Sequence, residues 1–140
     1  RELANFIFYV TNLPTFKDPD LKRQIRRAAI SPMSNIAEGF DRGTQAEFVD
    51  ALFIGKGETG EVRSQLYISY DQKYIDTETL NRGLGLTDEC SRLIQSFATK
   101  LKMEDRRGLQ FKKVYKKEET PEEFLKKYAP AHYEKVYGKN

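Results

Sequence analysis

Residues 21–40 read LKRQIRRAAISPMSNIAEGF, and this stretch decides the fold. Its apolar residues recur at intervals of three and four, as on one face of an α-helix; they are Leu21, Ile25, Ala28, Ala29, Ile36 and Phe40. Asp18 and Pro19 predict the start of this helix, because a carboxylate caps free backbone N–H groups and proline fits the first helical position. Pro32 removes one backbone donor, so we expect a bend there within a single helix that ends near Gly39.

Four basic side chains of the same stretch lie largely off the apolar stripe: Lys22, Arg23, Arg26 and Arg27. One interpretation is that they contact nucleic-acid phosphates. The other is that they pair with acidic residues of the next helix along the chain or of an adjacent subunit. The sequence leaves both interpretations open.

Three pieces of this region carry a resemblance to a known family: QIRRAA at residues 24–29, SNIAEG at residues 34–39, and Arg42. They resemble the signature of a bacterial four-helix-bundle family whose founding members are encoded by intervening sequences inside large-subunit ribosomal RNA genes. Relatives include the accessory variability proteins of diversity-generating retroelements. The resemblance covers roughly residues 1–102. One departure is Met33, which separates Pro32 from the Ser-Asn pair, whereas the family usually places its proline directly before that pair.

The resemblance implies an assembly as well as a fold. It implies a homopentamer, a ring of bundles around a central channel. It also implies a first helix that begins some turns before Arg1, so that the native N-terminus would extend beyond this chain. Asn35, Glu38 and Arg42 lie within the signature, and we interpret them as turn and interface residues or as a ligand site.

The remaining periodicity predicts three more helices. Leu3, Phe6, Val10 and Leu13 form one stripe before Pro14, and a capping box of Thr44 and Glu47 starts a long helix that reaches about Lys73. A fourth helix runs from Thr77 to about Lys102, with fraying or an irregular turn expected at Gly83 and Gly85. The fold class is therefore all-α: an antiparallel up-down-up-down four-helix bundle with a C-terminal helical or irregular tail.

The helix that follows Thr44 has two apolar stripes. One contains Phe48, Leu52, Gly55, Thr59, Val62 and Leu66, and the second contains Val49, Phe53, Gly60 and Tyr67. A helix with two packing faces usually contacts two neighbours. We therefore expect either the bundle core and a second subunit, or one broad core face.

The chain divides into residues 1–103, the bundle, and residues 104–140, a C-terminal extension that is packed on the bundle or mobile. A second capping box of Thr120 and Glu123, with Pro121 between them, predicts a short helix to about Tyr128, and Pro130 stops it. Residues 132–137 could add another turn that docks onto the bundle. Four lysines interleaved with Phe111 and Tyr115 are typical of a single-strand binder or of a solvated tail; they are Lys112, Lys113, Lys116 and Lys117.

Charge and composition narrow the function classes. Residues 1–103 carry 14 basic and 14 acidic side chains and the remainder carries 10 and 7, which accounts for the formal net charge of +3. A neutral bundle argues against strong nonspecific nucleic-acid binding, since phosphate neutralisation supplies most of that affinity. No apolar run is long enough to span a membrane, and one cysteine forms no internal disulfide. We expect a cytoplasmic bacterial protein.

Residues 55–60, GKGETG, match the dinucleotide fingerprint GxGxxG letter for letter. That fingerprint binds nucleotides only at a strand-to-helix turn, and here the preceding residues are periodic as a helix. Small residues that let another helix approach closely are the better interpretation.

Metal binding and nucleophilic catalysis have little support in the sequence. The only histidine is His132, in the tail, so the Glu-x-x-His pairs of di-iron bundles are absent from the sequence. A carboxylate site at Glu47, Asp50, Glu58 or Glu61 is a minor alternative to a solvated face. Cys90 fits a small buried hydrophobic residue better than a nucleophile.

The sequence therefore predicts a non-catalytic homo-oligomeric bundle protein without cofactor, metal or small-molecule substrate, with itself and RNA or DNA as candidate partners and no membrane. The alternative is a nucleic-acid-binding accessory factor of a reverse transcriptase, and a small carboxylate-metal enzyme is a third class.

Overall fold

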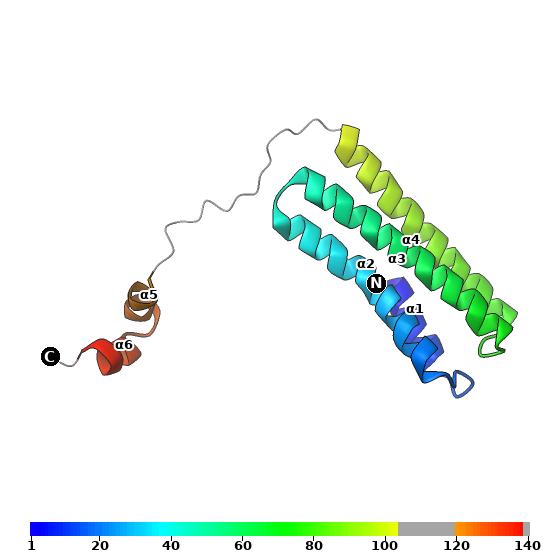
Figure 1. Cartoon of the computed structure of the whole chain (residues 1–140), viewed down its shortest axis with the longest axis horizontal. Coiled ribbons are helices and arrows are strands. Elements are labelled where there is room, and N and C mark those ends of the chain that lie inside the picture. The colour runs from blue at the N-terminus through cyan, green and yellow to red at the C-terminus, as the bar shows by residue number, and fades with distance from the viewer. Residues whose placement is uncertain (104–119, 139–140) are drawn as a thin grey trace.

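The computed structural model describes residues 1–103 and 120–138, and these fold into helices only, with no strand among them. The four helices α1 (Glu2–Thr11), α2 (Pro19–Arg42), α3 (Gln45–Asp71) and α4 (Thr77–Met103) run side by side with alternating direction (Figure 1). Each packs against its neighbours in chain order, and α1 also packs against α4, which closes the bundle. The predicted up-down-up-down bundle is confirmed.

The predicted start of α2 is confirmed, and that of α3 is confirmed in part: Thr44 caps the helix, but the Glu47 side chain accepts from the Thr44 hydroxyl instead of the Thr44 amide that a capping box requires. Asp18 accepts hydrogen bonds from the Asp20 and Leu21 amides at 2.8 and 2.9 Å, and Pro19 occupies the first helical position. Thr44 Oγ1 accepts from the Glu47 amide at 3.2 Å and starts α3. The end of α2 was predicted too early: the helix continues past Gly39 to Arg42, and Gly43 stops it with a left-handed φ of 87°.

Helices α2 and α3 approach closely at two places along their contact. A Cβ atom added to Gly39 would lie 2.2 Å from Ala51 Cβ, so the two helices leave no room for a side chain there. A Cβ atom added to Gly55 would lie 3.3 Å from Pro32 Cα. Pro32 is buried inside α2, which remains one helix through it, as predicted.

The GKGETG segment lies in the middle of α3, so the nucleotide interpretation is excluded and the close-approach interpretation holds for its first glycine. Gly57 and Gly60 differ from Gly55, because a Cβ atom at either would meet nothing within 4 Å. Both are exposed.

The core forms two clusters that lie one after the other along the bundle. The larger lies where all four helices meet, and the smaller lies between α2, α3 and α4 around Leu52, Ile94 and Ala98. The stripe predicted for α2 is buried at Ile25, Ala28 and Ala29. Phe40, however, is 55% exposed, so its predicted core position is wrong.

The exposure of Phe40 follows from the length of α1. With ten residues, α1 covers only the half of the bundle at which the α3–α4 turn lies (Figure 1). In the other half Met33 and Phe40 of α2 and Leu93 and Phe97 of α4 are 44–64% exposed. Phe48 of α3 lies between these two walls, with ring centroids 5.7 Å from Phe40 and 5.7 Å from Phe97. We call this surface the apolar patch.

The irregular turn expected in α4 is absent, because the helix runs without interruption through Gly83 and Gly85. Gly83 is buried under Leu66 of α3 and Phe6 of α1, and a Cβ atom added to it would lie 2.7 Å from Leu66 Cδ1. Tertiary packing therefore outweighs a cost of about 1 kcal/mol per glycine in a helix.

The two C-terminal helices are α5 (Pro121–Tyr128) and α6 (Pro130–Tyr137), and they pack against each other. The predicted capping box of Thr120 and Glu123 is present, and Tyr133 donates a hydrogen bond to Glu122 at 3.2 Å. The division of the chain at residue 103 and the docking of residues 132–137 stay predictions.

Alanine substitutions of the glycines should separate those that permit packing from those that do not. Gly57→Ala and Gly60→Ala should each stabilise the protein by about 0.5–1 kcal/mol, because they remove glycine's conformational entropy cost without a steric clash. Gly39→Ala should destabilise it by roughly 1–3 kcal/mol through the clash with Ala51. Urea unfolding followed by circular dichroism measures the differences. Stabilisation by Gly39→Ala would contradict the close approach of α2 and α3.

Asp76 caps α4 and makes the stability depend on pH. Its carboxylate accepts a hydrogen bond from the Thr79 amide at 2.8 Å, and bonds from the Thr79 side chain and backbone lower the pKa of Asp76 from its ordinary 3.8. A lowered folded-state pKa adds stability above the unfolded-state pKa and loses it as the pH falls through the folded value. Asp76→Ala should therefore lower the melting temperature near pH 7, and the difference from wild type should shrink below pH 3.8.

Asp76→Asn is the matched control, because asparagine caps helices as well but does not ionise in this range. A melting-temperature difference between wild type and Asp76→Ala that is the same at pH 7 and pH 2.5 would exclude the charged cap.

Candidate functional site

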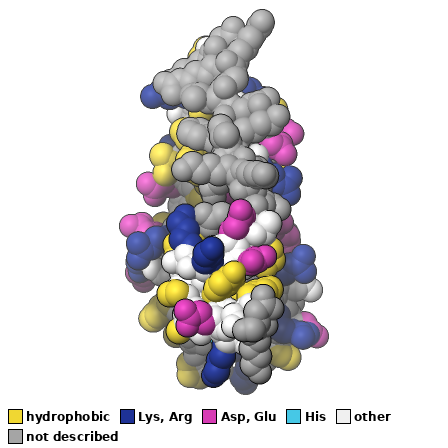
Figure 2. Space-filling view, turned by 90° about the vertical axis from the view of Figure 1, so that its left-hand side faces the viewer, with side chains coloured by type: hydrophobic (Ala, Val, Ile, Leu, Met, Phe, Trp, Pro, Cys, Tyr) yellow, Lys and Arg dark blue, Asp and Glu magenta, His cyan; other side chains and the backbone are white. Residues whose placement is uncertain are grey.

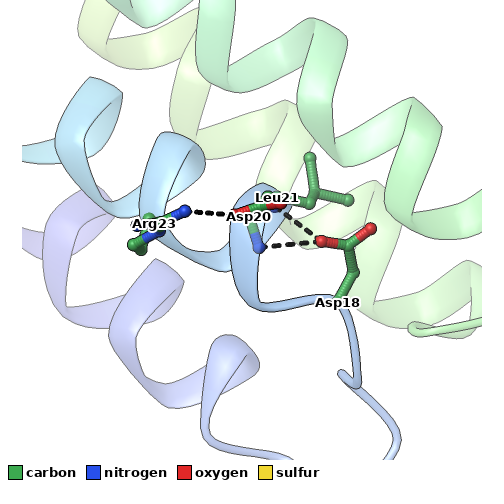
Figure 3. A network of polar contacts seen from close by, with 4 residues as sticks. All are labelled: Asp18, Asp20, Leu21 and Arg23. Carbon is green, nitrogen blue, oxygen red and sulfur yellow. Dashed lines mark hydrogen bonds and ion pairs between the residues drawn. The ribbon is translucent and has the colours of Figure 1, made fainter.

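Arg23, one of the four predicted phosphate contacts, pairs within its own helix. Its guanidinium donates to the Asp20 carboxylate, next to the Asp18 cap that starts α2 (Figure 3). The side chains of Arg23 and Asp20 are 79% and 70% exposed, so water screens this pair and it contributes little to stability. Arg23 stays available to a partner.

Arg26 fastens α1 to α2. Its Nε donates to Thr11 Oγ1 at 2.7 Å, and its Nη2 donates to Asn12 Oδ1 at 2.7 Å. Its Cζ lies 4.8 Å from the centre of the Phe8 ring, which adds a cation–π contact. Arg26 is half-buried and its donors are largely occupied, so the structure gives it a role in packing that the sequence did not predict.

Arg27 is exposed and makes no hydrogen bond or ion pair to another residue of the described ranges, and the same holds for the half-buried Lys22 side chain. Among those ranges the bases of α2 form no ion pair with α3 of the same chain. Figure 2 shows the side of the molecule on which α5 and α6 lie in Figure 1, and on this face Lys and Arg side chains are interspersed with Asp, Glu and hydrophobic side chains. The tail lysines Lys112, Lys113, Lys116 and Lys117 lie outside the described residues.

The signature residues Asn35, Glu38 and Arg42 follow one another along one side of α2 and face α3. Asn35 Nδ2 donates to Ser31 at 2.9 Å, and Arg42 donates to Glu38 at 2.5 Å. All three line a pocket of about 90 Å³ between the end of α2 and the start of α3. They share this pocket, but Asn35 bonds within its own helix turn rather than to the other two.

The charge of this pocket disfavours an anionic ligand. Glu47 and Asp50 of α3 line it beside Glu38, against the single base Arg42. Glu38 raises the pKa of Arg42 through a hydrogen bond and its charge, and Glu47 raises it further, so Arg42 stays protonated. Three carboxylates would repel a phosphate here. The pocket therefore fits a helix-end contact better than a nucleotide site.

The other candidate chemistry finds no assembled site in the described part of the chain. There, no three His, Cys, Asp or Glu side chains lie close enough together to hold a metal ion. Cys90 is half-buried against both core clusters, and its Sγ lies 3.8 Å from Thr59 Oγ1. No helix of the described residues is long and apolar enough to cross a bilayer.

Sequence reasoning missed Gln65, a buried amide on α3. Its Nε2 donates to Glu61 at 2.9 Å, but its Oε1 is the one buried side-chain oxygen or nitrogen without a partner in residues 1–103 and 120–138. Buried hydroxyls such as those of Thr59 and Ser69 instead bond the carbonyl four residues earlier in the helix. The sequence contained no signal beyond the position of this glutamine in α3, because burial of its oxygen depends on how the helices pack.

A comparison with protein families now adds to this geometry. The model of the family described as 23S rRNA-intervening sequence protein matches residues 1–96, which include α1, α2, α3 and most of α4. The chain belongs to the 23S rRNA-intervening sequence protein family. The family named by the sequence resemblance is therefore confirmed. No curated protein and no solved structure matches the chain.

The signature residues Asn35, Glu38 and Arg42 lie within the matched region, and the structure places them at the contact between α2 and α3. The last seven residues of α4 and the α5–α6 pair lie outside it.

Replacing Arg26 tests its packing role. Arg26→Ala should destabilise the protein by about 1–2 kcal/mol, because it removes two charge-assisted hydrogen bonds and the contact with Phe8. Arg27→Ala is the matched control one residue away and should leave the unfolding free energy within about 0.5 kcal/mol. Thermal and urea unfolding measure both. Equal losses for the two variants would contradict the assignment of Arg26 to the α1–α2 contact.

Proposed function

We propose that this chain is a non-catalytic homo-oligomeric scaffold of the 23S rRNA-intervening sequence protein family, with the homopentamer that its sequence resemblance implies. The observation that supports the assembly is the exposure of large apolar side chains on the bundle. Ile30 of α2 and Ile54 and Ile68 of α3 are each at least 42% exposed. Burying such side chains against a second copy is worth roughly 25 cal/mol per Å² of apolar area removed from water.

The non-catalytic part is supported by the way polar side chains are used. Arg42 and Glu38 pair with each other, Arg26 holds α1, and Thr59 and Ser69 bond their own helix. These groups are engaged in packing rather than directed together at a shared point where a substrate could react.

Sedimentation velocity of the full chain tests the assembly. We expect a single species of five protomers that persists on dilution to low micromolar concentration. A protein that sediments as one protomer throughout this range would contradict the proposal, and another defined stoichiometry would contradict the pentamer alone.

Association with RNA is the second candidate, and exposed Arg23 and Arg27 are the observation that favours it. If they contact phosphates, a mobility shift with ribosomal RNA fragments should weaken as salt rises and should be lost in the Arg23→Ala/Arg27→Ala variant. Arg92→Ala, on α4, is the control. The absence of a mobility shift at low salt would contradict RNA association and would leave the homo-oligomeric scaffold as the proposed function. The alternative function, an accessory factor of a reverse transcriptase, depends on the same two arginines. The absence of a mobility shift would therefore contradict it as well.

A further inference from the structure

Two edges of the bundle carry opposite charge. The α2 basic edge consists of Arg23, Arg27 and Ile30, which are spaced four and three residues apart and therefore share one side of the helix. The α3 acidic edge consists of Ile54, Glu58, Glu61 and Ile68, spaced by four, three and seven. All except half-buried Glu58 are exposed, and the isoleucines Ile30, Ile54 and Ile68 are 42–55% exposed.

The two edges also lie at the same level along the bundle axis. Gly39 lies against Ala51 and Gly55 lies against Pro32, which fixes the antiparallel register of α2 and α3. Glu61 follows Gly55 by six residues, and Arg27 precedes Pro32 by five. Arg27 and Glu61 therefore lie at nearly the same level, with an isoleucine on the same side of each helix.

Within one chain, no ion pair among the described residues joins the two edges. Arg27 makes no ion pair to another described residue, and Glu61 accepts only the Gln65 amide among the contacts recorded in residues 1–103 and 120–138. Gln65 Oε1, beside that carboxylate, lacks a donor. The exposed Glu61 carboxylate therefore retains acceptor capacity for a guanidinium of another chain.

We infer that the α2 basic edge of one copy binds the α3 acidic edge of a second copy. This inference rests on the proposed homo-oligomer and names its contact surface. Because the two edges are different surfaces of one chain, the contact is head-to-tail, and contacts of that kind form a ring when the rotation between copies closes and an open filament when it does not. The charges align the copies and the isoleucines supply apolar area. The apolar patch is the competing surface, but nothing among its side chains selects a second copy as its partner.

Charge reversal tests the contact in the full chain. Arg27→Glu and Glu61→Arg should each weaken self-association at least tenfold in sedimentation velocity, because each places like charges opposite each other. The Arg27→Glu/Glu61→Arg double variant should restore association, since it exchanges the two signs. Lys100→Glu, an exposed charge reversal on α4, and Leu93→Asp, on the apolar patch, are the controls and should leave association unchanged.

The possible outcomes distinguish a failure of the edge contact from a failure of the proposed homo-oligomer. A wild-type oligomer that both single reversals leave intact, or that only Leu93→Asp disrupts, would overturn the edge contact and keep the homo-oligomer. A wild-type single protomer would overturn both. Loss of an RNA mobility shift in Arg27→Glu with unchanged association would assign the α2 basic edge to nucleic acid instead. Circular dichroism establishes that each variant is folded, and Arg27→Glu removes no contact with a described residue.

Discussion

The close approach of α2 and α3 is the constraint on which the rest of the structure depends. Gly39 against Ala51 and Gly55 against Pro32 allow these long helices to pack almost backbone to backbone. That contact fixes their register and places the signature residues Asn35, Glu38 and Arg42 beside the start of α3. A side chain at Gly39 would force the helices apart, and the pocket and both charged edges would move with them.

Helices α1 and α4 pack against the α2–α3 pair to different extents. Helix α4 packs along α3 over its length, whereas α1 covers half of the bundle and is fastened at its C-terminal end by Arg26. The half without α1 exposes Phe40, Leu93 and Phe97. The half without α1 therefore retains exposed apolar surface, whereas the charged edges of α2 and α3 at Arg27 and Glu61 lie in the half that α1 covers.

Local signals in the sequence were sufficient for much of the fold. The Asp18 and Thr44 caps, the stripe of α2 and the small residue Gly55 were predicted, because capping and periodicity depend on neighbours in the chain. The packing role of Gly83 was not predicted, because its contacts with Leu66 and Phe6 involve three helices. The role of Arg26 and the unpaired Gln65 oxygen were missed for the same reason: both depend on contacts between helices, which a single sequence does not display. The predicted site residues divide accordingly into Arg26, which packs, and Arg23 and Arg27, which stay exposed.

Native-state hydrogen exchange, read residue by residue, tests the central place of the α2–α3 contact most directly. The amides of residues 33–39 and 51–59 should exchange only through global unfolding. Those of residues 6–11 in α1 should exchange through a smaller opening that leaves α2 and α3 intact. Exchange of the α2–α3 amides through local openings, while α1 remains protected to the global limit, would contradict this account.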